Sequence, residues 1–221
     1  MIAARQIAFG SGGGKRLPDG VVQVEYLENA ANNYINTGVI IGQYPNRRIE
    51  AKFSNCKYVS NFDFYHGLFG VVEDSNGNST GIKVISNSAI RLRDGRNQST
   101  DIEMVIPASF ECSLSRNGAV INGVGYPYIF TLFYSALVSP IDIFGFSNYT
   151  DGIPKNNTCG RGRCHYFKIY DGNILLFDAI PVRVGDVGYM YDKVSGQLFG
   201  NAGTGAFILG ADAFSVNGGG V

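Results

Sequence analysis

Acidic side chains are the first candidates for chemistry in this sequence, because glycoside hydrolysis needs two carboxylates that flank the scissile bond. On a strand, such carboxylates share one face when they alternate along the sequence. The chain has only six glutamates, and its nearest approach to this pattern is Asp101-Ile102-Glu103, which lacks a third acid. The acids therefore predict a protein that is not an enzyme.

Nucleophilic catalysis of the Ser-His-Asp kind would need a histidine as the general base. The two histidines, His66 and His165, both lie in segments rich in aromatic residues, which are typical of strands. No Gly-x-Ser-x-Gly elbow accompanies either of them. We expect each histidine to be a hydrogen-bonded residue of a sandwich.

The cysteines could bind zinc only if two pairs lay at ligand spacing. Cys159 and Cys164 bracket a Gly-Arg-Gly-Arg segment, but no second pair exists and His165 alone does not complete a site. Reduced thiols or a loop disulfide are the two alternatives for this pair. Cys56 and Cys112 lie in segments that are predicted to be strands, and we expect both to be buried thiols.

Calcium has one candidate loop, the oxygen-rich run Asp74-Ser75-Asn76-Gly77-Asn78. It lacks the bidentate glutamate that an EF-hand loop places at its end. The run predicts a hairpin turn, so no cofactor is expected, although calcium stays an open alternative.

Sugar binding needs aromatic faces for the pyranose ring and planar polar groups for its hydroxyls. The most suitable residues for this are Asn148, Tyr149 and Asp151, together with Arg161 and Arg163. We expect these five residues to form a ligand-binding loop. The alternative is that they form an ordinary exposed connection.

The first twenty residues predict an arm. Glycine-rich residues 10–14 are followed by Lys15 and Arg16, without the strand and the Ser/Thr that a phosphate-binding loop requires. Ordering such glycines costs about 1–2 kcal/mol each. A partner chain that buried Ile2, Ile7 and Phe9 would offset this cost, so we expect these residues to anchor the arm to another chain rather than to its own body.

Composition limits the remaining possibilities. The formal net charge is zero, which gives no reason to expect binding to nucleic acid or anionic lipid and leaves self-association unopposed. No secretory signal is visible at the N-terminus, and the longest apolar region, residues 129–138, is too short to span a bilayer. The charge balance therefore permits a homo-oligomer, and a membrane span is not expected.

Any functional site must be built on strands, because apolar and polar residues alternate along much of the sequence. Ile90 and Leu92 alternate with arginines before Asp94-Gly95, and Phe110, Cys112 and Leu114 alternate with polar residues before Asn117-Gly118. Val22, Val24 and Tyr26 alternate in the same way. Such strands, separated by Asn-Gly and Asp-Gly turns, are typical of an antiparallel sandwich with negligible helix. The best turns are Asn117-Gly118, Asn122-Gly123 and Asp171-Gly172.

Three segments carry a family resemblance. They are Val24-Glu25-Tyr26-Leu27-Glu28 with the following Tyr34-Ile35-Asn36-Thr37-Gly38, residues 167–183, and residues 187–207. Their order and spacing resemble those of concanavalin A-like, laminin-G-like jelly rolls from gut bacterial surface proteins and phage virion accessory proteins. The resemblance implies an all-β, two-sheet antiparallel β-sandwich over residues 21–212, with an arm at 1–20 and a glycine-rich tail at 213–221. In such a sandwich we expect residues 201–205 to turn the last strand back, Pro181 to end an edge strand, and Asp178 and Arg183 to satisfy backbone groups.

The resemblance also suggests two functions. The first is a non-catalytic, lectin-like virion protein, assembled in the host cytoplasm and bound to other virion chains through its arm. The alternative is a carbohydrate-binding module on the surface of a gut bacterium. Both readings allow cell-surface glycans as partners.

Overall fold

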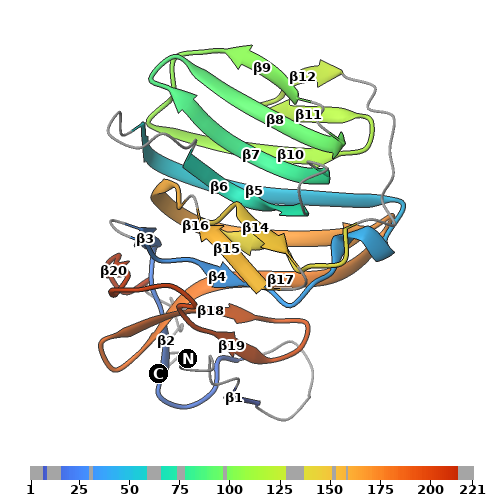
Figure 1. Ribbon diagram of the computed structural model, residues 1–221. Helices are drawn as coiled ribbons and strands as arrows, with labels where there is room; N and C mark the ends of the chain where they lie inside the picture. The colour runs from blue at the N-terminus through green and yellow to red at the C-terminus, as the bar shows by residue number, and fades with distance from the viewer. Residues whose placement is uncertain are drawn as a thin grey trace.

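The alternating residues form strands, and the strands form two sheets that pack face to face (Figure 1). The structure is a computed structural model and describes residues 7–8, 16–29, 32–58, 66–73, 78–96, 99–127, 137–150, 153–157 and 159–213. The only helical element in these ranges is the 3-10 turn η1 (Ile41–Gln43). The predicted all-β sandwich is confirmed.

The larger sheet follows the order β1-β19-β18-β17-β16-β5-β10-β11-β12, with β2, β3 and β20 paired beside this path. Its described strands are β1 (Ile7–Ala8), β2 (Val21–Gln23), β3 (Leu27–Asn29), β5 (Arg47–Lys57), β10 (Ser109–Ser115), β11 (Gly118–Ile121), β12 (Val124–Pro127), β16 (Arg161–Asp171), β17 (Ile174–Val184), β18 (Val187–Asp192), β19 (Gln197–Phe199) and β20 (Ile208–Leu209).

The smaller sheet follows the order β15-β14-β6-β7-β8-β9, with β13 and β4 paired beside β6. Its described strands are β4 (Ile35–Asn36), β6 (His66–Glu73), β7 (Asn78–Ser86), β8 (Ala89–Arg96), β9 (Ser99–Glu103), β13 (Asp142–Ile143), β14 (Ser147–Thr150) and β15 (Ile153–Asn157). β14 runs parallel to β6, which departs from the antiparallel expectation. Phe144 adopts a left-handed φ of 63° just before this strand, in the segment where the chain leaves β13 and turns back along β6.

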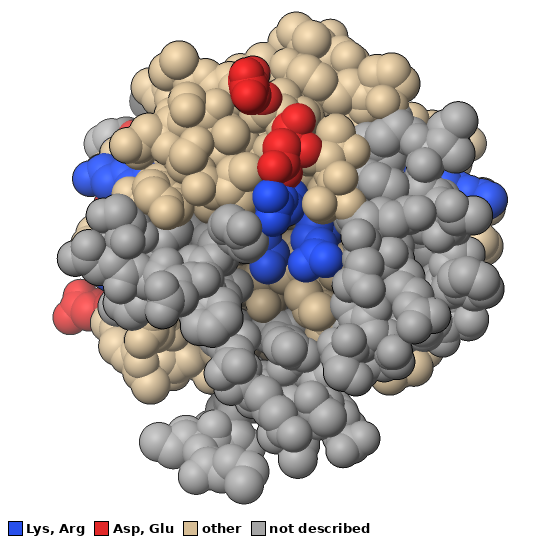
Figure 2. All heavy atoms as spheres, turned by 45° about the horizontal axis from the view of Figure 1, so that its top comes forward, with Lys and Arg blue, Asp and Glu red and all other residues tan. Residues whose placement is uncertain are grey.

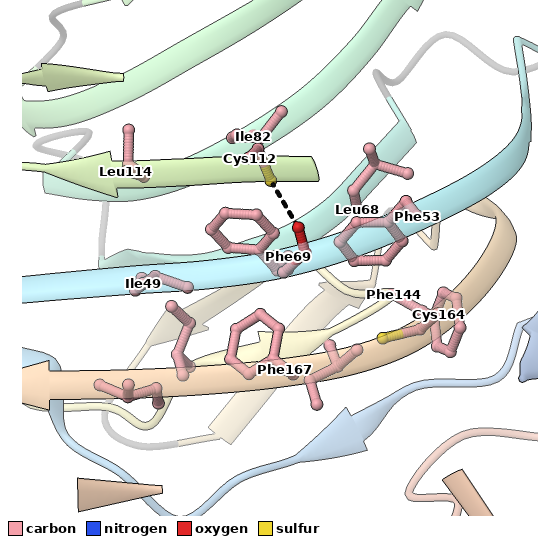
Figure 3. Packing of buried hydrophobic residues seen from close by; sticks show 14 of the residues in the cluster. Ile49, Phe53, Leu68, Phe69, Ile82, Cys112, Leu114, Phe144, Cys164 and Phe167 are labelled. Carbon is pink, nitrogen blue, oxygen red and sulfur yellow. Dashed lines mark hydrogen bonds between the residues drawn. The ribbon is translucent and has the colours of Figure 1, made fainter. Parts of the chain in front are cut away.

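Aromatic rings join the two sheets in the core (Figure 3). The ring of Phe53, on β5, lies 6.2 Å from that of Phe69 on β6 and 6.1 Å from that of Phe144. Phe167, on β16, contacts Phe69 edge-to-face at 5.3 Å. Each fully buried ring contributes roughly 1.5–3 kcal/mol. The predicted inward residues are also buried: Ile90, Leu92, Phe110, Cys112 and Leu114.

The turn chemistry is partly as predicted. Asn122 and Gly123 both have positive φ, 48° and 80°, which the two-residue turn between β11 and β12 requires. Hairpins also join β16 to β17 at Gly172 and β18 to β19. Asp94 and Gly95, in contrast, lie inside β8 and pair with Thr80 and Ser79. Continuous pairing with β7 overrides the local turn preference there.

Two predictions are wrong near the point where β17 stops pairing with β16 and begins to pair with β2. Pro181 lies inside β17 and not at an edge, opposite Met190 of β18. Its carbonyl accepts a hydrogen bond from the Val24 amide at 3.1 Å, at the point where β17 passes from β16 to β2. The segment predicted as one strand through Val22, Val24 and Tyr26 is likewise split into β2, on β17, and β3, on β16.

The closing segment fulfils its predicted role. The Asn201 side chain accepts a bond from the Gly203 amide at 2.9 Å and donates to the Gly205 carbonyl at 2.9 Å, which folds the chain back toward β20. Arg183 donates to the Gly185 carbonyl at 3.1 Å, as expected. Asp178 instead forms an ion pair with Lys193 at 2.7 Å.

The arm contacts its own sandwich at its described residues, which corrects the expectation of an arm bound only to another chain. β1 pairs with β19, with Ile7 opposite Leu198, and Leu17 packs against the cluster that contains Val21 and Val182. The reason is that β19 offers an edge whose backbone groups β1 satisfies. Ile2 and Phe9 lie outside the described residues, as do residues 214–221.

No helix within the described ranges has the length and apolar character needed to cross a membrane.

Candidate functional site

Three cationic side chains gather on the outer face of the smaller sheet. Lys83 lies on β7, and Arg91 and Arg93 lie on β8. All three alternate with the buried residues Ile82, Val84, Ile90 and Leu92, so they point away from the core. Lys83 is directly opposite Arg91, while Gly81 is opposite Arg93. We call Lys83, Arg91 and Arg93 the basic cluster. Figure 2 shows basic side chains next to acidic ones on the surface of the molecule.

Asp101, on β9, fixes one member of the basic cluster. Its two carboxylate oxygens accept bonds from Arg91 Nε and Nη2 at 2.6 and 2.8 Å. These bonds hold the pKa of the Asp101 carboxyl below its usual value. The Arg91 guanidinium group is therefore held in place beside β9, the edge strand of the smaller sheet.

Lys83 is the unusual member, because it is only 7% exposed. Its Nζ lies 3.8 Å from the centre of the Phe146 ring. Burial, followed by the fields of Arg93 and Arg91, lowers the pKa of Lys83 from 10.5 to about 7. A desolvated cation beside two guanidinium groups is costly to hold, and strongly perturbed groups of this kind are concentrated at functional sites.

Glycines seat the Phe146 ring over β6 and β7. A Cβ atom at Gly70 or at Gly81 would approach Phe146 Cε2 to 2.4 or 2.6 Å, so the ring occupies the space above both residues. Both also have a φ that disfavours other residues, 151° and 144°. Phe146 is itself buried, and its ring lies against the Lys83 ammonium group. Close by on β7, the buried Ser79 hydroxyl has no hydrogen-bond partner in the described ranges.

The outer face of the larger sheet has a different character, because several of its charges occur in pairs. Arg163 bonds to Glu28 at 2.7 Å and lies over the Tyr26 ring at 4.2 Å. Arg48 pairs with Glu50 at 2.9 Å, and Lys52 with Glu111 at 3.4 Å. Opposite charges in neighbouring positions are the usual pattern for a solvated sheet face.

The five sequence-predicted binding residues fall on both sheets. Arg161 and Arg163 belong to β16 of the larger sheet. Asn148 and Tyr149 belong to β14 of the smaller sheet, which pairs with β15, so this segment is a strand and not a loop. The side chains of Asn148 and Tyr149, and the whole of Asp151, lie outside the described part of the chain. The set therefore stays a prediction.

The histidine expectation is confirmed for His165. One ring nitrogen lies 2.7 Å from the Ser54 hydroxyl, and the other lies 2.9 Å from the Glu25 carbonyl oxygen. Burial lowers the pKa of the imidazole. The His66 side chain is not among the described ones.

The cysteines are free thiols in the structure, and Cys112, Cys159 and Cys164 are buried. Burial raises the pKa of the Cys56 and Cys159 thiols to about 12. The described residues contain no group of three or more His, Cys, Asp or Glu side chains that could hold a metal ion. Residues 74–77 of the candidate calcium loop lie outside them, between β6 and β7.

Sequence reasoning missed the basic cluster. The signal present was the pair Arg91 and Arg93 at alternate positions, which places both on one face. Lys83 joins them only through the register of β7 with β8, and its burial depends on Phe146, sixty-three positions further along the chain. Neither relation can be predicted from local patterns.

No protein-family model and no curated protein sequence matches this chain. Among solved structures, a protein of Bacteroides ovatus assigned as carbohydrate-binding aligns with a TM-score of 0.51 and 10% identity. The alignment covers 87% of this chain and 61% of that protein, so this chain spans less than two thirds of its length. This similarity shows a shared β-sandwich fold and nothing finer.

Two further structures align more loosely. The NanB sialidase from Streptococcus pneumoniae has a TM-score of 0.47 and 12% identity over 67% of this chain and 25% of its own. The CBM40 of the Ruminococcus gnavus IT-sialidase, bound to alpha2,3 sialyllactose, has a TM-score of 0.42 and 14% identity over 68% of this chain and 91% of its own. These two similarities carry no argument about this chain. The two packed sheets of the structure place this protein in the class of jelly-roll-like β-sandwiches.

Proposed function

We propose that this protein is a non-catalytic carbohydrate-binding module whose glycan binds on the outer face of the smaller sheet. The basic cluster carries the proposal, because it gathers three hydrogen-bond donors at neighbouring positions on one face of the sheet. Guanidinium and ammonium groups donate to sugar hydroxyl, ring and acidic oxygens. The carbohydrate-binding assignment of the Bacteroides ovatus protein, which shares the fold, supports the proposal.

The setting that this function implies is a bacterial or extracellular surface. The sequence suggested two hypotheses, a virion protein and a carbohydrate-binding module. The similarity to the Bacteroides ovatus protein supports the carbohydrate-binding module and gives no support to the virion protein. Surface glycans are therefore the partners that we propose.

The two described acids of β9 do not form a hydrolytic pair. Asp101 and Glu103 both point outward from β9, two positions apart. A glycosidase would need one of its carboxyls free to donate a proton or to attack, but both oxygens of Asp101 are held by Arg91. We infer that the protein binds glycans without cleaving them.

A glycan array probed with the full chain tests the proposal. We expect saturable binding to at least one class of glycan, reversed by the same free glycan, with no cleavage of it after prolonged incubation. Absence of binding to every glycan would contradict the proposed function. Hydrolysis that the variant Glu103→Gln abolishes would contradict its non-catalytic part.

The array also separates the two faces. Arg163→Gln removes a charge from the outer face of the larger sheet, where the sequence placed part of the site, and Arg93→Gln removes one from the basic cluster. We expect only Arg93→Gln to weaken binding. The reverse result would transfer the site to the larger sheet.

A further inference from the structure

A second apolar cluster lies on the outer face of the larger sheet, where a solvated sheet usually carries polar residues. Its members are Val21, Val182, Tyr191 and Leu198, with Leu17, Ile180 and Tyr189 packed against them. We call these seven residues the outer cluster. Along β17, β18 and β19 they alternate with residues of the main core, such as Phe177, Met190 and Phe199. Val182 and Leu198 are nevertheless only 0% and 1% exposed, so the outer cluster is a covered surface.

Described residues of the arm lie against the outer cluster. Leu17 packs on it, and β1 extends the larger sheet by pairing with β19, where Ala8 lies opposite Gln197 (Figure 1). The sequence between β1 and Leu17 includes residues 10–14, of which four are glycines. Glycine restricts the backbone less than any other residue, so the sequence permits the arm more than one path.

Exposed valines flank the outer cluster at both ends of β18. Val184 and Val187 are opposite each other at the β17–β18 turn, and Val184 is also opposite Val21 of the cluster. Val194 lies in the turn that joins β18 to β19. The three exposed fractions are 38%, 55% and 42%. A second molecule on this part of the sheet would bury these side chains, and a formal net charge of zero opposes no such approach between two copies.

We propose that two copies of this protein exchange their arms, so that β1 of each copy pairs with β19 of the other. The β19 edge and the outer cluster make the same contacts with either arm, because the two arms are identical. Exchange of an identical element is therefore a low-cost route to a symmetric dimer. Burial of the exposed valines is the contact that the dimer adds.

The arm is long enough for this exchange. Residues 9–16 join β1 to Leu17, and a chain of eight residues spans roughly 26–29 Å when extended. Two sheets that pack face to face are about 10 Å apart. β1 can therefore reach β19 of the second copy while Leu17 stays on the outer cluster of its own.

The dimer would carry two smaller sheets. If each binds a glycan as proposed above, the dimer binds a surface that displays many glycans with a higher avidity than one copy does. This consequence alone rests on the proposed function, whereas the exchange of arms does not.

Disulfide trapping in the full chain tests the exchange directly. Cα atoms at opposite positions of an antiparallel pair are about 4.5–5.5 Å apart, which a disulfide can bridge. A chain with Ala8→Cys is mixed with an affinity-tagged chain with Gln197→Cys, and the mixture is oxidised mildly. The control mixture replaces Gln197→Cys by Asn117→Cys, because Asn117 is exposed in the β10–β11 turn, several strands away from β19. The unaltered protein is the blank for its native thiols.

We expect disulfide-linked pairs of one tagged and one untagged chain to be at least about fivefold more abundant in the first mixture than in the control, because pairing raises the effective concentration of the two thiols. A single chain with both Ala8→Cys and Gln197→Cys should form internal links when dilute. The share of links between chains should rise with protein concentration.

Sedimentation velocity measures the dimer itself. Val187→Lys places like charges among the exposed valines of the two copies, and Val120→Lys is its matched control, because Val120 is an exposed valine of β11. We expect Val187→Lys to weaken dimerisation at least about tenfold and Val120→Lys to leave it unchanged.

Three results would overturn the exchange of arms. The first is a full chain that stays monomeric at every concentration, with only internal links in the doubly substituted chain. The second is an equal yield of linked pairs in both mixtures, which would indicate random collision. The third is a dimer without the mixed disulfide, which would place the interface elsewhere. Circular dichroism shows whether each variant keeps its fold, and none of these results changes what the glycan array says about the proposed function.

Discussion

Replacing Asp192 by alanine is expected to lower the free energy of unfolding by about 3–5 kcal/mol, because it removes a buried carboxylate that accepts four hydrogen bonds and leaves their donors unsatisfied. Asp192 ends β18 and accepts bonds from the amides of Asp178, Val194 and Ser195 at 2.8, 3.1 and 3.0 Å. The Ser195 hydroxyl donates a fourth bond at 2.6 Å. An alanine leaves these donors without an acceptor next to the β18–β19 turn.

Urea denaturation of the variant measures this effect. Asp186→Ala is the matched control, since Asp186 lies exposed in the turn between β17 and β18, and its replacement should change stability by no more than about 0.5 kcal/mol. If both alanine variants lost an equally small amount of unfolding free energy, Asp192 would not stabilise the hairpin of β18 and β19.

Replacing Lys83 by methionine is expected to raise stability by about 1–3 kcal/mol at pH 6–7, since a buried cation is exchanged for an apolar chain of similar length. The gain should depend on pH. Because the pKa of Lys83 falls from 10.5 to about 7 on folding, the unfolded chain binds more protons between these values. The stability of the unaltered protein therefore rises with pH across that window, and the advantage of the variant shrinks by up to about 1.4 kcal/mol per pH unit.

The comparison is made from pH about 6 to 8.5 by chemical denaturation of both proteins. Burial raises the pKa of the Cys56 and Cys159 thiols to about 12, so ionisation of these thiols in the unfolded chain lowers stability as the pH approaches 9 and beyond. This contribution is the same in both proteins and cancels in their difference. A difference in stability that did not change with pH would mean that Lys83 keeps an ordinary pKa in the folded protein.

The strands of the sandwich could be predicted where local alternation and turn residues agree. The buried Ile90 and Leu92, and the Asn122-Gly123 turn with its two positive φ angles, follow from period-two patterning and from the conformational freedom of asparagine and glycine. These are properties of a few consecutive residues, so the sequence displays them directly.

Prediction failed where long-range pairing decides the outcome. Asp94-Gly95 would favour a turn in isolation, yet pairing with Ser79 and Thr80 keeps it in β8. Pro181 is tolerated inside β17 because the neighbouring strand changes from β16 to β2 at that point. The arm strand β1 is paired with β19, where Ile7 lies opposite Leu198, a residue far along the chain that no local pattern reveals.

The candidate site was hidden for the same reason. Arg91 and Arg93 were visible as outward residues, but an outward arginine usually means only a solvated face. What distinguishes this face is the burial of Lys83 under the combined effect of register and of Phe146, which is seated over glycines. The predicted residues Arg161 and Arg163 instead lie in β16, where Arg163 is engaged by Glu28 and Tyr26.

Nuclear magnetic resonance of the full chain, titrated with the glycan that binds most strongly on the array, tests the central claim most directly. Backbone amide signals and arginine Nε–H signals report on each face separately. We expect the largest shifts at Gly81, Lys83, Arg91 and Arg93, with little change at Tyr26, Arg163 and Tyr166. Shifts confined to Tyr26, Arg163 and Tyr166, with the signals of β7 and β8 unmoved, would contradict a glycan site on the smaller sheet.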